Sequence, residues 1–317
     1  MAQPWDADID LDLVQAARLI YEQFPDVAMA AGVDDAEALA TAMAPLGEGW
    51  DNRAFLVAGR FVFRFPRREV ALAFLAAERE VLPQLRGRLP LPIPFPRWLG
   101  QPSAGFPYPF IGYACLPGQT ADRVDLATVD QDALARDLGG FLRALHAVAP
   151  PAETPLDGLR RSDTAWRYEQ ATARLAELTD RPLAGHVQAL LDQALEALPP
   201  DADAAGAAHR VLVHGDLYSK HLLIREGALA GVIDWGDVHQ GDPAQDLAAG
   251  WLVLPTAARP AFEAAYGGID TGTAARARLR AIWDVVITLH FTERSPDEGL
   301  RASALACVAD AAGWWAQ

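Results

Sequence analysis

One stretch, residues 211–235, constrains this chain more than any other; it reads VLVHGDLYSKHLLIREGALAGVIDW. Three short apolar runs lie within it, each bounded by glycine or by charged residues: 211–213, 222–224 and 230–233. Runs of this length with such borders predict short buried strands, and the glycine turn between the second and third runs predicts a hairpin. We therefore expect Asp216, His221 and Asp234 to lie at the edges of one small sheet and to face one cleft.

Three polar side chains at this spacing match the needs of phosphoryl transfer. A carboxylate must orient the attacking hydroxyl, and oxygen or nitrogen ligands must hold the Mg²⁺ that binds the phosphates. Asp216 would be the catalytic carboxylate, and His221 and Asp234 would be the metal ligands. Because single residues of these types are common in turns and cores, the prediction depends on their joint spacing. His214 is predicted to be structural, buried and orienting the Asp216 loop.

These residues resemble the catalytic and metal-binding segment of the aminoglycoside phosphotransferase family, which has a protein-kinase-like fold. That family carries HGD, usually an Asn five residues after the Asp, and then an Ile-Asp-aromatic segment. In this sequence His221 stands where the Asn is expected, which is also a feature of the macrolide phosphotransferases within the family. The resemblance implies an α+β, bilobal fold. It would have a small antiparallel-sheet N-terminal lobe, residues 1–115, and a mainly helical C-terminal lobe, residues 116–317.

A glycine-containing loop, LGEGWDN, precedes two strand-like segments at 53–58 and 61–65. A glycine turn between strands lets backbone N–H groups approach phosphates closely. Gly47, Gly49 and Asn52 would cover the phosphates, with Asn52 at the position where kinases carry the third glycine of G-x-G-x-x-G. The string also resembles a bacterial subgroup of the same phosphotransferase family.

Arg64 lies on the second of these strands, where kinase-like folds keep a lysine that holds the α- and β-phosphates. A guanidinium can bind phosphate through two N–H groups, so the role could survive this departure. In a helix over residues 69–85, Glu78 would face the sheet and could pair with Arg64, while Glu80 would face outward. Ala114 lies in the segment that the resemblance identifies as the hinge, whose backbone contacts the nucleotide base.

Composition narrows the classes of partner. The net charge is −15 and the pI is near 4.8, a balance that repels nucleic acid and anionic membranes and attracts cationic small molecules. No stretch approaches the length of a membrane span, and no basic-then-apolar leader opens the chain. Two cysteines without metal-ligand spacing fit a reducing compartment. We expect a cytoplasmic monomer or weak homodimer that binds neither nucleic acid nor membrane.

The resemblance implies a small-molecule kinase that uses Mg²⁺ and transfers the γ-phosphate of ATP or GTP to a hydroxyl. Its acceptor would be an antibiotic, either a macrolide or an aminoglycoside, so the activity would confer resistance. The acceptor could be cationic and could bind near the C-terminal helices, where four carboxylates occur: Asp284, Glu293, Asp297 and Glu298.

Three other functions stay open. A primary-metabolite kinase acting on a sugar, choline or homoserine could share the fold. A nucleotide-binding module without catalysis would explain two departures from the family pattern, Arg64 for Lys and His221 for Asn. A metal hydrolase could use a set of four ligands: His214, Asp216, His221 and Asp234.

Overall fold

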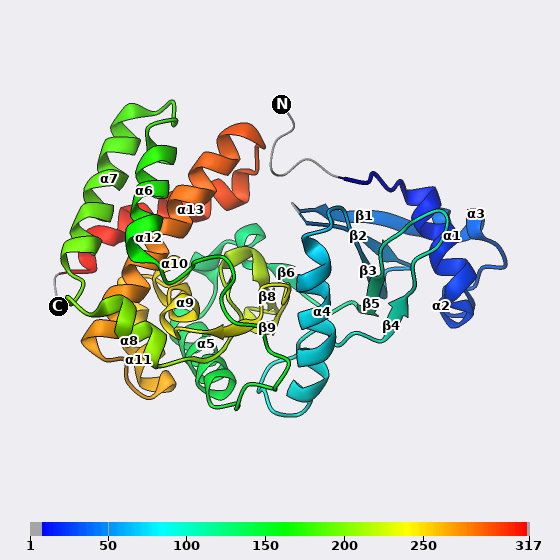
Figure 1. Ribbon diagram of the computed structural model, residues 1–317, viewed down its shortest axis with the longest axis horizontal. Helices are drawn as coiled ribbons and strands as arrows, with labels where there is room; N and C mark the ends of the chain where they lie inside the picture. The colour runs from blue at the N-terminus through cyan, green and yellow to red at the C-terminus, as the bar shows by residue number, and fades with distance from the viewer. Residues whose placement is uncertain (1–7, 50, 316–317) are drawn as a thin grey trace. The chain divides into compact units, whose positions relative to one another are not determined.

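The computed structural model describes residues 8–49 and 51–315, which form two compact units. The first unit contains the described residues up to 86 together with 93–116, and the second contains 87–92 and the described residues from 117 onward. Figure 1 shows the larger sheet in the first unit and most of the helices in the second. This combination of an antiparallel-sheet unit and a mainly helical unit confirms the predicted α+β class.

The first unit begins with three short helices: α1 (Leu13–Gln23), α2 (Pro25–Ala31) and α3 (Ala36–Thr41). Asp12 caps α1 by accepting a hydrogen bond from the Gln15 N–H, and the Gln15 side chain returns the contact as a capping box. Asp35 caps α3 in the same way through the Ala38 N–H. Pro25 follows the end of α1 and begins α2, because proline suits the first turn of a helix.

Five antiparallel strands follow in the order β1-β2-β3-β5-β4. Their bounds are β1 (Met43–Glu48), β2 (Asn52–Val57), β3 (Phe61–Pro66), β4 (Trp98–Gly100) and β5 (Phe110–Ala114). The sequence did not predict β1, which forms because its residues pair with β2 and thereby place the glycine loop at a hairpin end.

The central strand β3 is buried on both faces. Phe61, Phe63 and Phe65 alternate onto the face that packs under α1, where they join a largely aromatic core. Val62 and Arg64 take the opposite face, toward α4 (Ala71–Val81), which a 3₁₀ turn, η1 (Leu82–Leu85), extends. The α-helix is therefore shorter than the predicted 69–85.

Helices make up most of the second unit: α5 (Gln131–His146), α6 (Thr164–Leu175), α7 (Arg181–Glu196), α8 (Ala202–Ala208), α9 (Ala244–Leu247), α10 (Ala249–Leu252), α11 (Arg259–Tyr266), α12 (Thr271–Arg294) and α13 (Glu298–Asp310). Short 3₁₀ turns join them: η2 (Ala121–Arg123), η3 (Leu126–Thr128), η4 (Ser219–His221), η5 (Thr256–Ala258) and η6 (Ala311–Gly313). The long α12 packs against α6, α7, α9 and α13, and α5 packs against α11. Among the described residues, none of the helices combines the length and apolar character needed to cross a membrane.

The strands of the second unit form two small sheets, so the predicted single sheet is wrong. β7 (Val211–Val213) pairs with β10 (His239–Gly241), while the predicted hairpin forms from β8 (Leu222–Arg225) and β9 (Ala228–Val232) and is joined by β6 (Gln119–Thr120). The partner of β7 comes from a segment whose single glycine and polar residues gave no strand pattern.

The proline-rich segment 88–100 is divided between the two units, and its residues from 93 onward belong to the first. Residues 87–92 belong to the second unit, where the Val232 N–H donates a hydrogen bond to the Pro92 carbonyl oxygen at 3.1 Å. A proline cannot donate from its nitrogen, but its carbonyl still accepts, so the segment can border β9.

Candidate active site

The β8–β9 hairpin brings His221 and Asp234 to one end of the three-stranded sheet. His221 immediately precedes β8, Asp234 follows β9 after one residue, and the register pairs Leu222 with Val232. Since antiparallel pairing continues outward from that pair, the flanking residues lie side by side. His221 Nε2 is 3.3 Å from Asp234 Oδ2. Asp234 has a φ of 64°, a left-handed conformation that Asp tolerates better than most residues and that often marks a functional site.

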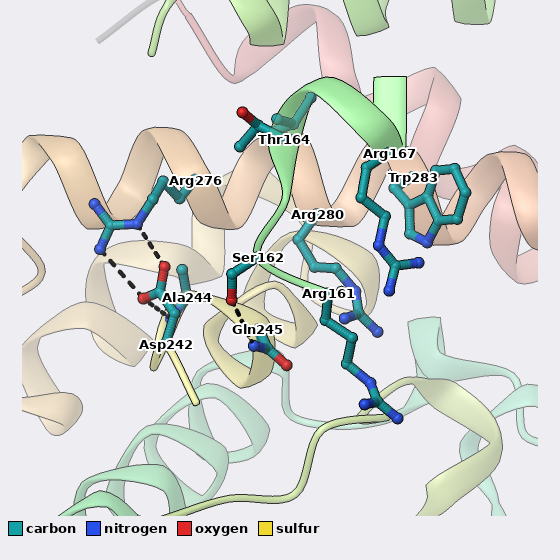
Figure 2. Close-up of a pocket in the computed structure, with 11 residues that line it drawn as sticks. Arg161, Ser162, Thr164, Arg167, Asp242, Ala244, Gln245, Arg276, Arg280 and Trp283 are labelled. Carbon is teal, nitrogen blue, oxygen red and sulfur yellow. Dashed lines mark hydrogen bonds and ion pairs between the residues drawn. The ribbon is translucent and has the colours of Figure 1, made fainter. Parts of the chain in front are cut away.

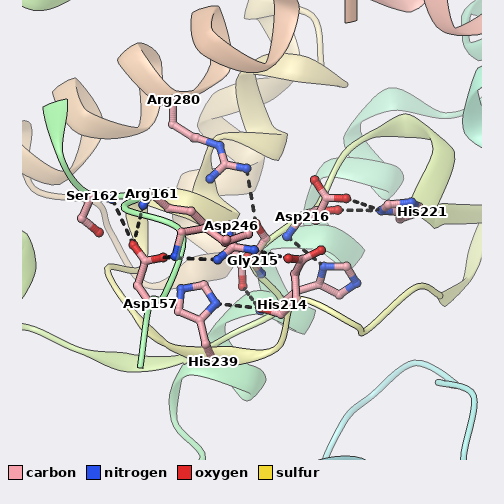
Figure 3. A network of polar contacts seen from close by, with 12 residues as sticks. Asp157, Arg161, Ser162, His214, Gly215, Asp216, His221, His239, Asp246 and Arg280 are labelled. Atoms are coloured by element: carbon pink, nitrogen blue, oxygen red, sulfur yellow. Dashed lines mark hydrogen bonds and ion pairs between the residues drawn. The ribbon is translucent and has the colours of Figure 1, made fainter. Parts of the chain in front are cut away.

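Asp216 approaches the same imidazole from the loop after β7. Its carbonyl oxygen lies 2.6 Å from His221 Nδ1, and its Oδ2 lies 3.6 Å from that nitrogen. Asp216, His221 and Asp234 therefore gather around one ring, and Figure 3 shows Asp216 facing His221. The side chains of Asp216 and Asp234 are 39% and 45% exposed, whereas that of His221 is 7% exposed. Two accessible carboxylates flank a buried imidazole.

His214 has the structural part that the sequence predicts. It is fully buried, and its Nδ1 accepts a hydrogen bond from the Asp216 N–H at 3.3 Å. Nε2 must then carry the proton and donate it to the Ile233 carbonyl oxygen at 2.9 Å, which fixes a neutral tautomer. Burial lowers the pKa of His214 and favours the same neutral form. Because the backbone engages both ring nitrogens, the hydrolase alternative loses one of its four ligands.

One buried carboxylate holds the catalytic loop. Asp246 in α9 accepts hydrogen bonds from the His214 N–H at 2.7 Å and from the Gly215 N–H at 2.8 Å. Gly215 has a φ of 87°, and a Cβ at this position would lie 2.5 Å from the Asp237 carbonyl oxygen, so only glycine fits. Through these contacts Asp246 holds the backbone of the loop that carries Asp216.

The sequence analysis did not predict that His146 and Tyr266 would form a hydrogen-bonded chain with Asp246. His146 Nε2, at the end of α5, lies 3.2 Å from Asp246 Oδ2, and His146 Nδ1 lies 2.9 Å from the Tyr266 hydroxyl. Burial alone would raise the pKa of Asp246, but the hydrogen bond and charge of His146 and the hydrogen bond from the Gly215 N–H outweigh it and lower that pKa. The one available signal was the position of His146 four residues after the core residue Leu142, which indicates an inward-facing ring.

The carboxylates and the imidazole of the cluster shift one another's pKa values. Desolvation raises the pKa of Asp216 to about 6, against the attraction of His221. Desolvation opposes protonation of His221, but the hydrogen bond and charge of Asp234, together with the charge of Asp216, outweigh it and raise the pKa of His221 to about 9. At neutral pH Asp216 is therefore largely ionised and His221 is an imidazolium.

The donor set fits Mg²⁺ through oxygen. Mg²⁺ is commonly held by one or two carboxylates, with water and substrate phosphates completing its ligands, and Asp216 and Asp234 present such oxygens. Within residues 8–49 and 51–315, no three His, Cys, Asp or Glu side chains converge as a self-contained metal cluster. Both nitrogens of His221 have protein partners, so direct ligation by His221 would require Nε2 to leave Asp234.

In the first unit, Arg64 and Glu78 pair as predicted. Arg64 Nη1 lies 3.0 Å from Glu78 Oε1 and 3.1 Å from Oε2, and both side chains are buried. The alternation of β3 and the phase of α4 create this contact, since each element turns its polar residue toward the other. Lys220 is the only lysine in the sequence, and it lies outside β3. Arg64 is therefore the basic residue that this chain offers in place of the kinase lysine on that strand. Glu80 is exposed, which confirms that it faces outward.

The predicted nucleotide-covering residues lie in the β1–β2 connection. The Gly49 N–H donates to the Asn52 carbonyl oxygen at 2.9 Å and closes the turn, and the space that a Cβ at Gly47 would occupy is open. Trp50 lies outside the described residues. Ala114 is exposed at the end of β5, opposite Phe61 of β3.

Three of the four carboxylates predicted for an acceptor site have partners within the second unit, while Glu298 is exposed. Asp284 pairs with Arg280 at 2.8 Å, and Asp297 caps α13 and contacts Lys220 at 3.4 Å. Glu293 accepts hydrogen bonds from Thr179. Ion pairs therefore partly neutralise Asp284 and Asp297, which weakens the argument for a free acidic surface there.

Comparison with known proteins agrees with this geometry. The model of the phosphotransferase enzyme family matches residues 42–282, about three quarters of the chain. The chain belongs to this family. The match covers the glycine loop, Arg64, Glu78 and the 211–235 stretch, and it confirms the family to which the sequence was assigned.

Two curated relatives of this phosphotransferase-family chain are aminoglycoside 3'-phosphotransferases from Escherichia coli and Salmonella typhimurium. Each is 31% identical over 147 residues, which is 44% of this chain and 50% of the relative. The alignment therefore spans about half the length of these curated relatives.

Solved structures extend the likeness to the whole fold. The GDP complex of aminoglycoside 2'-phosphotransferase-IIIa is similar with a TM-score of 0.65 and 25% identity, covering 96% of this chain and 99% of that one. Macrolide 2'-phosphotransferase MphH from Brachybacterium faecium is similar with a TM-score of 0.56 and 25% identity, covering 91% and 97%. The predicted kinase-like fold of this family is confirmed.

Proposed function

We propose that this chain is a small-molecule kinase that transfers the γ-phosphate of ATP or GTP to a hydroxyl of an antibiotic-like acceptor. The observation that carries the proposal is the convergence of Asp216 and Asp234 on His221, in a chain that belongs to the phosphotransferase family. Asp216 would be the catalytic residue, and Asp234 would bind metal.

In the proposed reaction, the acceptor oxygen forms a bond to the γ-phosphorus, while the bond from that phosphorus to the β–γ bridging oxygen breaks. The hydroxyl proton passes to the Asp216 carboxylate, and the nucleoside diphosphate leaves. A pKa of about 6 keeps Asp216 largely ionised at neutral pH and makes it a stronger base than an ordinary aspartate.

Bound Mg²⁺ would neutralise charge on the β- and γ-phosphates. Asp234 would supply its protein oxygen ligand, and His221, 3.3 Å from that carboxylate, would position it. Direct ligation by His221 stays a prediction from the sequence resemblance. In the first unit, Arg64 oriented by Glu78 would bind the α- and β-phosphates.

The remaining nucleotide contacts would come from backbone. Gly47, Gly49 and Asn52 would cover the phosphates with the turn that the Gly49 N–H closes, and the Ala114 backbone would meet the base. A nucleoside triphosphate donor also favours a cytoplasmic location, which we propose on that ground.

The relatives support an antibiotic as the first acceptor class to test, since their names refer to aminoglycosides and macrolides. A sugar, choline or homoserine kinase would use the same catalytic residues, so it forms the second class. The purified chain should be incubated with Mg²⁺ and ATP or GTP against a panel of both classes. The measured quantities are nucleoside diphosphate release and, by mass spectrometry, the phosphorylated acceptor.

We expect phosphorylation of a hydroxyl in one class, and loss of at least ~10²-fold in rate for Asp216→Asn. Tight binding of Mg²⁺–nucleotide with no phosphorylated product across the panel would instead favour the nucleotide-binding module.

A further inference from the structure

A small pocket in the second unit lies beside the catalytic loop and is lined largely by arginine. Its volume is about 40 Å³, room for a group the size of a carboxylate or phosphate rather than for a whole ligand. Arg161 and Arg167 line it from the start of α6 and the loop before it, and Arg276 and Arg280 line it from α12. Asp242 is the one carboxylate among the lining residues that the structure describes.

Arg276 is already neutralised. Its Nε lies 2.6 Å from Asp242 Oδ2, and both side chains are buried. Figure 2 shows this pair turned toward each other, while the guanidinium groups of Arg161, Arg167 and Arg280 gather on the other side of the pocket. The lining therefore carries three positive charges that no lining carboxylate balances.

Two of these three arginines bind carboxylates outside the pocket. Arg161 contacts Asp157 at 3.2 Å and also Asp237, and Arg280 Nε contacts Asp284 at 2.8 Å. The Nη1 atom of Arg280 is nevertheless buried and, among the described residues, has no hydrogen-bond acceptor. A buried donor without an acceptor is costly, and an oxyanion would satisfy it.

Arg167 has no carboxylate within ion-pair distance in the described part of the chain. It donates to the carbonyl oxygens of Leu159 and Arg160 at 3.3 and 3.2 Å, and its guanidinium lies 4.7 Å from the ring centroid of Trp283. Burial, and then repulsion by Arg280, lowers the pKa of Arg167 to about 9. A bound anion would relieve this crowding of like charges.

The pocket adjoins the catalytic residue through Arg280. Its Nη2 donates to the Gly215 carbonyl oxygen at 3.3 Å, and Gly215 immediately precedes Asp216. The positive charge of Arg280 also opposes the upward shift in the pKa of Asp216. A group held by Arg280 would therefore lie close to a hydroxyl oriented by Asp216.

We propose that Arg167 and Arg280, with the charge of Arg161, bind an anionic group of the acceptor, a carboxylate or a phosphate, next to the hydroxyl that Asp216 orients. This inference rests on the proposed phosphotransfer but not on the antibiotic class of acceptor, because it assigns the acceptor a carboxylate or phosphate group. It differs from the cationic acceptor expected from the net charge, because a local cluster of guanidinium groups determines which substituent binds there.

The first experiment tests the anion site without nucleotide. Inorganic phosphate is titrated into the chain at constant ionic strength, with chloride as the replaced anion, and binding is followed by thermal unfolding. Arg167→Gln should weaken phosphate binding at least ~10-fold, and Arg167→Lys should retain part of it. Arg174→Gln is the matched control, since Arg174 is on the same helix and stacks on Trp283 at 5.2 Å without lining the pocket.

Equal phosphate effects in the parent, Arg167→Gln and Arg174→Gln would overturn the anion site, because the stabilisation by phosphate would then not depend on Arg167. The second experiment asks whether the site serves the acceptor. Gluconate, sorbitol and glucamine share a hydroxyl chain and differ at one end, which is anionic, neutral and cationic respectively. Their phosphorylation is compared beside the antibiotic and metabolite panel.

We expect turnover to favour acceptors with an anionic group, inorganic phosphate to compete with them, and Arg167→Gln to raise their KM at least ~10-fold with little change in kcat. Preferred turnover of cationic or neutral acceptors, unaffected by Arg167→Gln, would overturn the acceptor assignment while leaving phosphotransfer intact. Phosphate binding that depends on Arg167, with no phosphorylation of any acceptor, would instead overturn the proposed kinase and with it the acceptor role.

Discussion

At the scale of single residues, the chemistry depends on how His221 separates two carboxylates. Its Nδ1 lies 3.6 Å from Asp216 Oδ2 and its Nε2 lies 3.3 Å from Asp234 Oδ2, so the two aspartates keep distinct surroundings on either side of one ring. Without the imidazolium their charges would repel across the same space. The arrangement allows one carboxylate to meet the acceptor and the other to meet metal.

Substitution of the two aspartates should separate their roles. Asp216→Asn keeps shape and loses basicity, so kcat should fall at least ~10²-fold while the Kd for Mg²⁺–nucleotide changes by no more than a few-fold. Asp234→Asn should weaken Mg²⁺–nucleotide binding and turnover together. Isothermal titration beside steady-state kinetics measures both, with the exposed Asp203→Asn as control. Loss of nucleotide binding in Asp216→Asn would contradict the assignment.

Arg64 offers a second test at this scale. Arg64→Ala removes the phosphate-binding group and leaves the buried Glu78 charge without this partner, so we expect weaker nucleotide binding and a loss of roughly 3–5 kcal/mol in the free energy of unfolding. Arg64→Lys restores the commoner kinase residue and should keep nucleotide Kd within about 10-fold of the parent. Urea unfolding and nucleotide titration are the measurements. Unchanged nucleotide affinity in a folded Arg64→Ala variant would remove Arg64 from the site.

At the scale of elements, α5 and α9 fix the loop that carries Asp216. His146 ends α5, Asp246 lies in α9, and together they connect the helices to the backbone of residues 214 and 215. Two hydrogen bonds to one buried carboxylate hold the peptide N–H groups in place. The loop is thus positioned by packed helices rather than by its own sequence.

Asp246→Asn should loosen this loop and change the acid stability of the chain. The Asn side chain is uncharged and has one acceptor oxygen, so it cannot replace both hydrogen bonds from the His214 and Gly215 N–H groups. We therefore expect a loss of about 2–3 kcal/mol in unfolding free energy at pH 7. The folded-state pKa of Asp246 lies below the ordinary value, so its stabilisation is present above about pH 3.9 and lost as pH falls through the folded pKa.

The difference in unfolding free energy between the parent and Asp246→Asn should therefore shrink as the solution becomes strongly acidic. Urea unfolding of both chains between neutral and acid pH measures the difference, and Asp203→Asn again serves as control. A difference in unfolding free energy that stayed constant down to the most acidic folded condition would count against a charged Asp246.

At the scale of the whole molecule, two units divide the proposed work. The sheet unit carries Arg64, Glu78 and the glycine loop. The helical unit carries the cluster of Asp216, His221 and Asp234 and the arginine-lined pocket. Function in this reading needs the entire chain, since neither unit holds both nucleotide and acceptor groups.

Ligand-linked stability tests that reading on the intact chain. Mg²⁺–ATP or Mg²⁺–GTP at about 100 times its Kd should raise the unfolding free energy by ~2.7 kcal/mol, and EDTA should remove most of this gain. EDTA without nucleotide should change little. A large loss of stability on EDTA treatment alone, with no response to nucleotide, would favour the resident metal of a hydrolase.

The sequence alone was sufficient for features encoded in short windows. The strand–HGD–hairpin spacing predicted that Asp216, His221 and Asp234 would meet, and the alternation of β3 with the helical phase of α4 predicted the Arg64–Glu78 pair. The hairpin turn brings His221 and Asp234 together, and periodicities of two and 3.6 residues turn Arg64 and Glu78 toward each other, so local order carries both predictions.

Only the tertiary structure decided the contacts between distant segments. β7 pairs with β10 rather than with the adjacent hairpin, His146 meets Asp246 from 100 residues away, and arginines from α6 and α12 form one pocket beside Gly215. No local pattern marks these pairings, because packing of whole helices and the need to satisfy buried polar groups select them after the elements exist. The sequence therefore determined that Asp216, His221 and Asp234 meet, while the tertiary structure decided which residues hold them in place and which charges lie beside them.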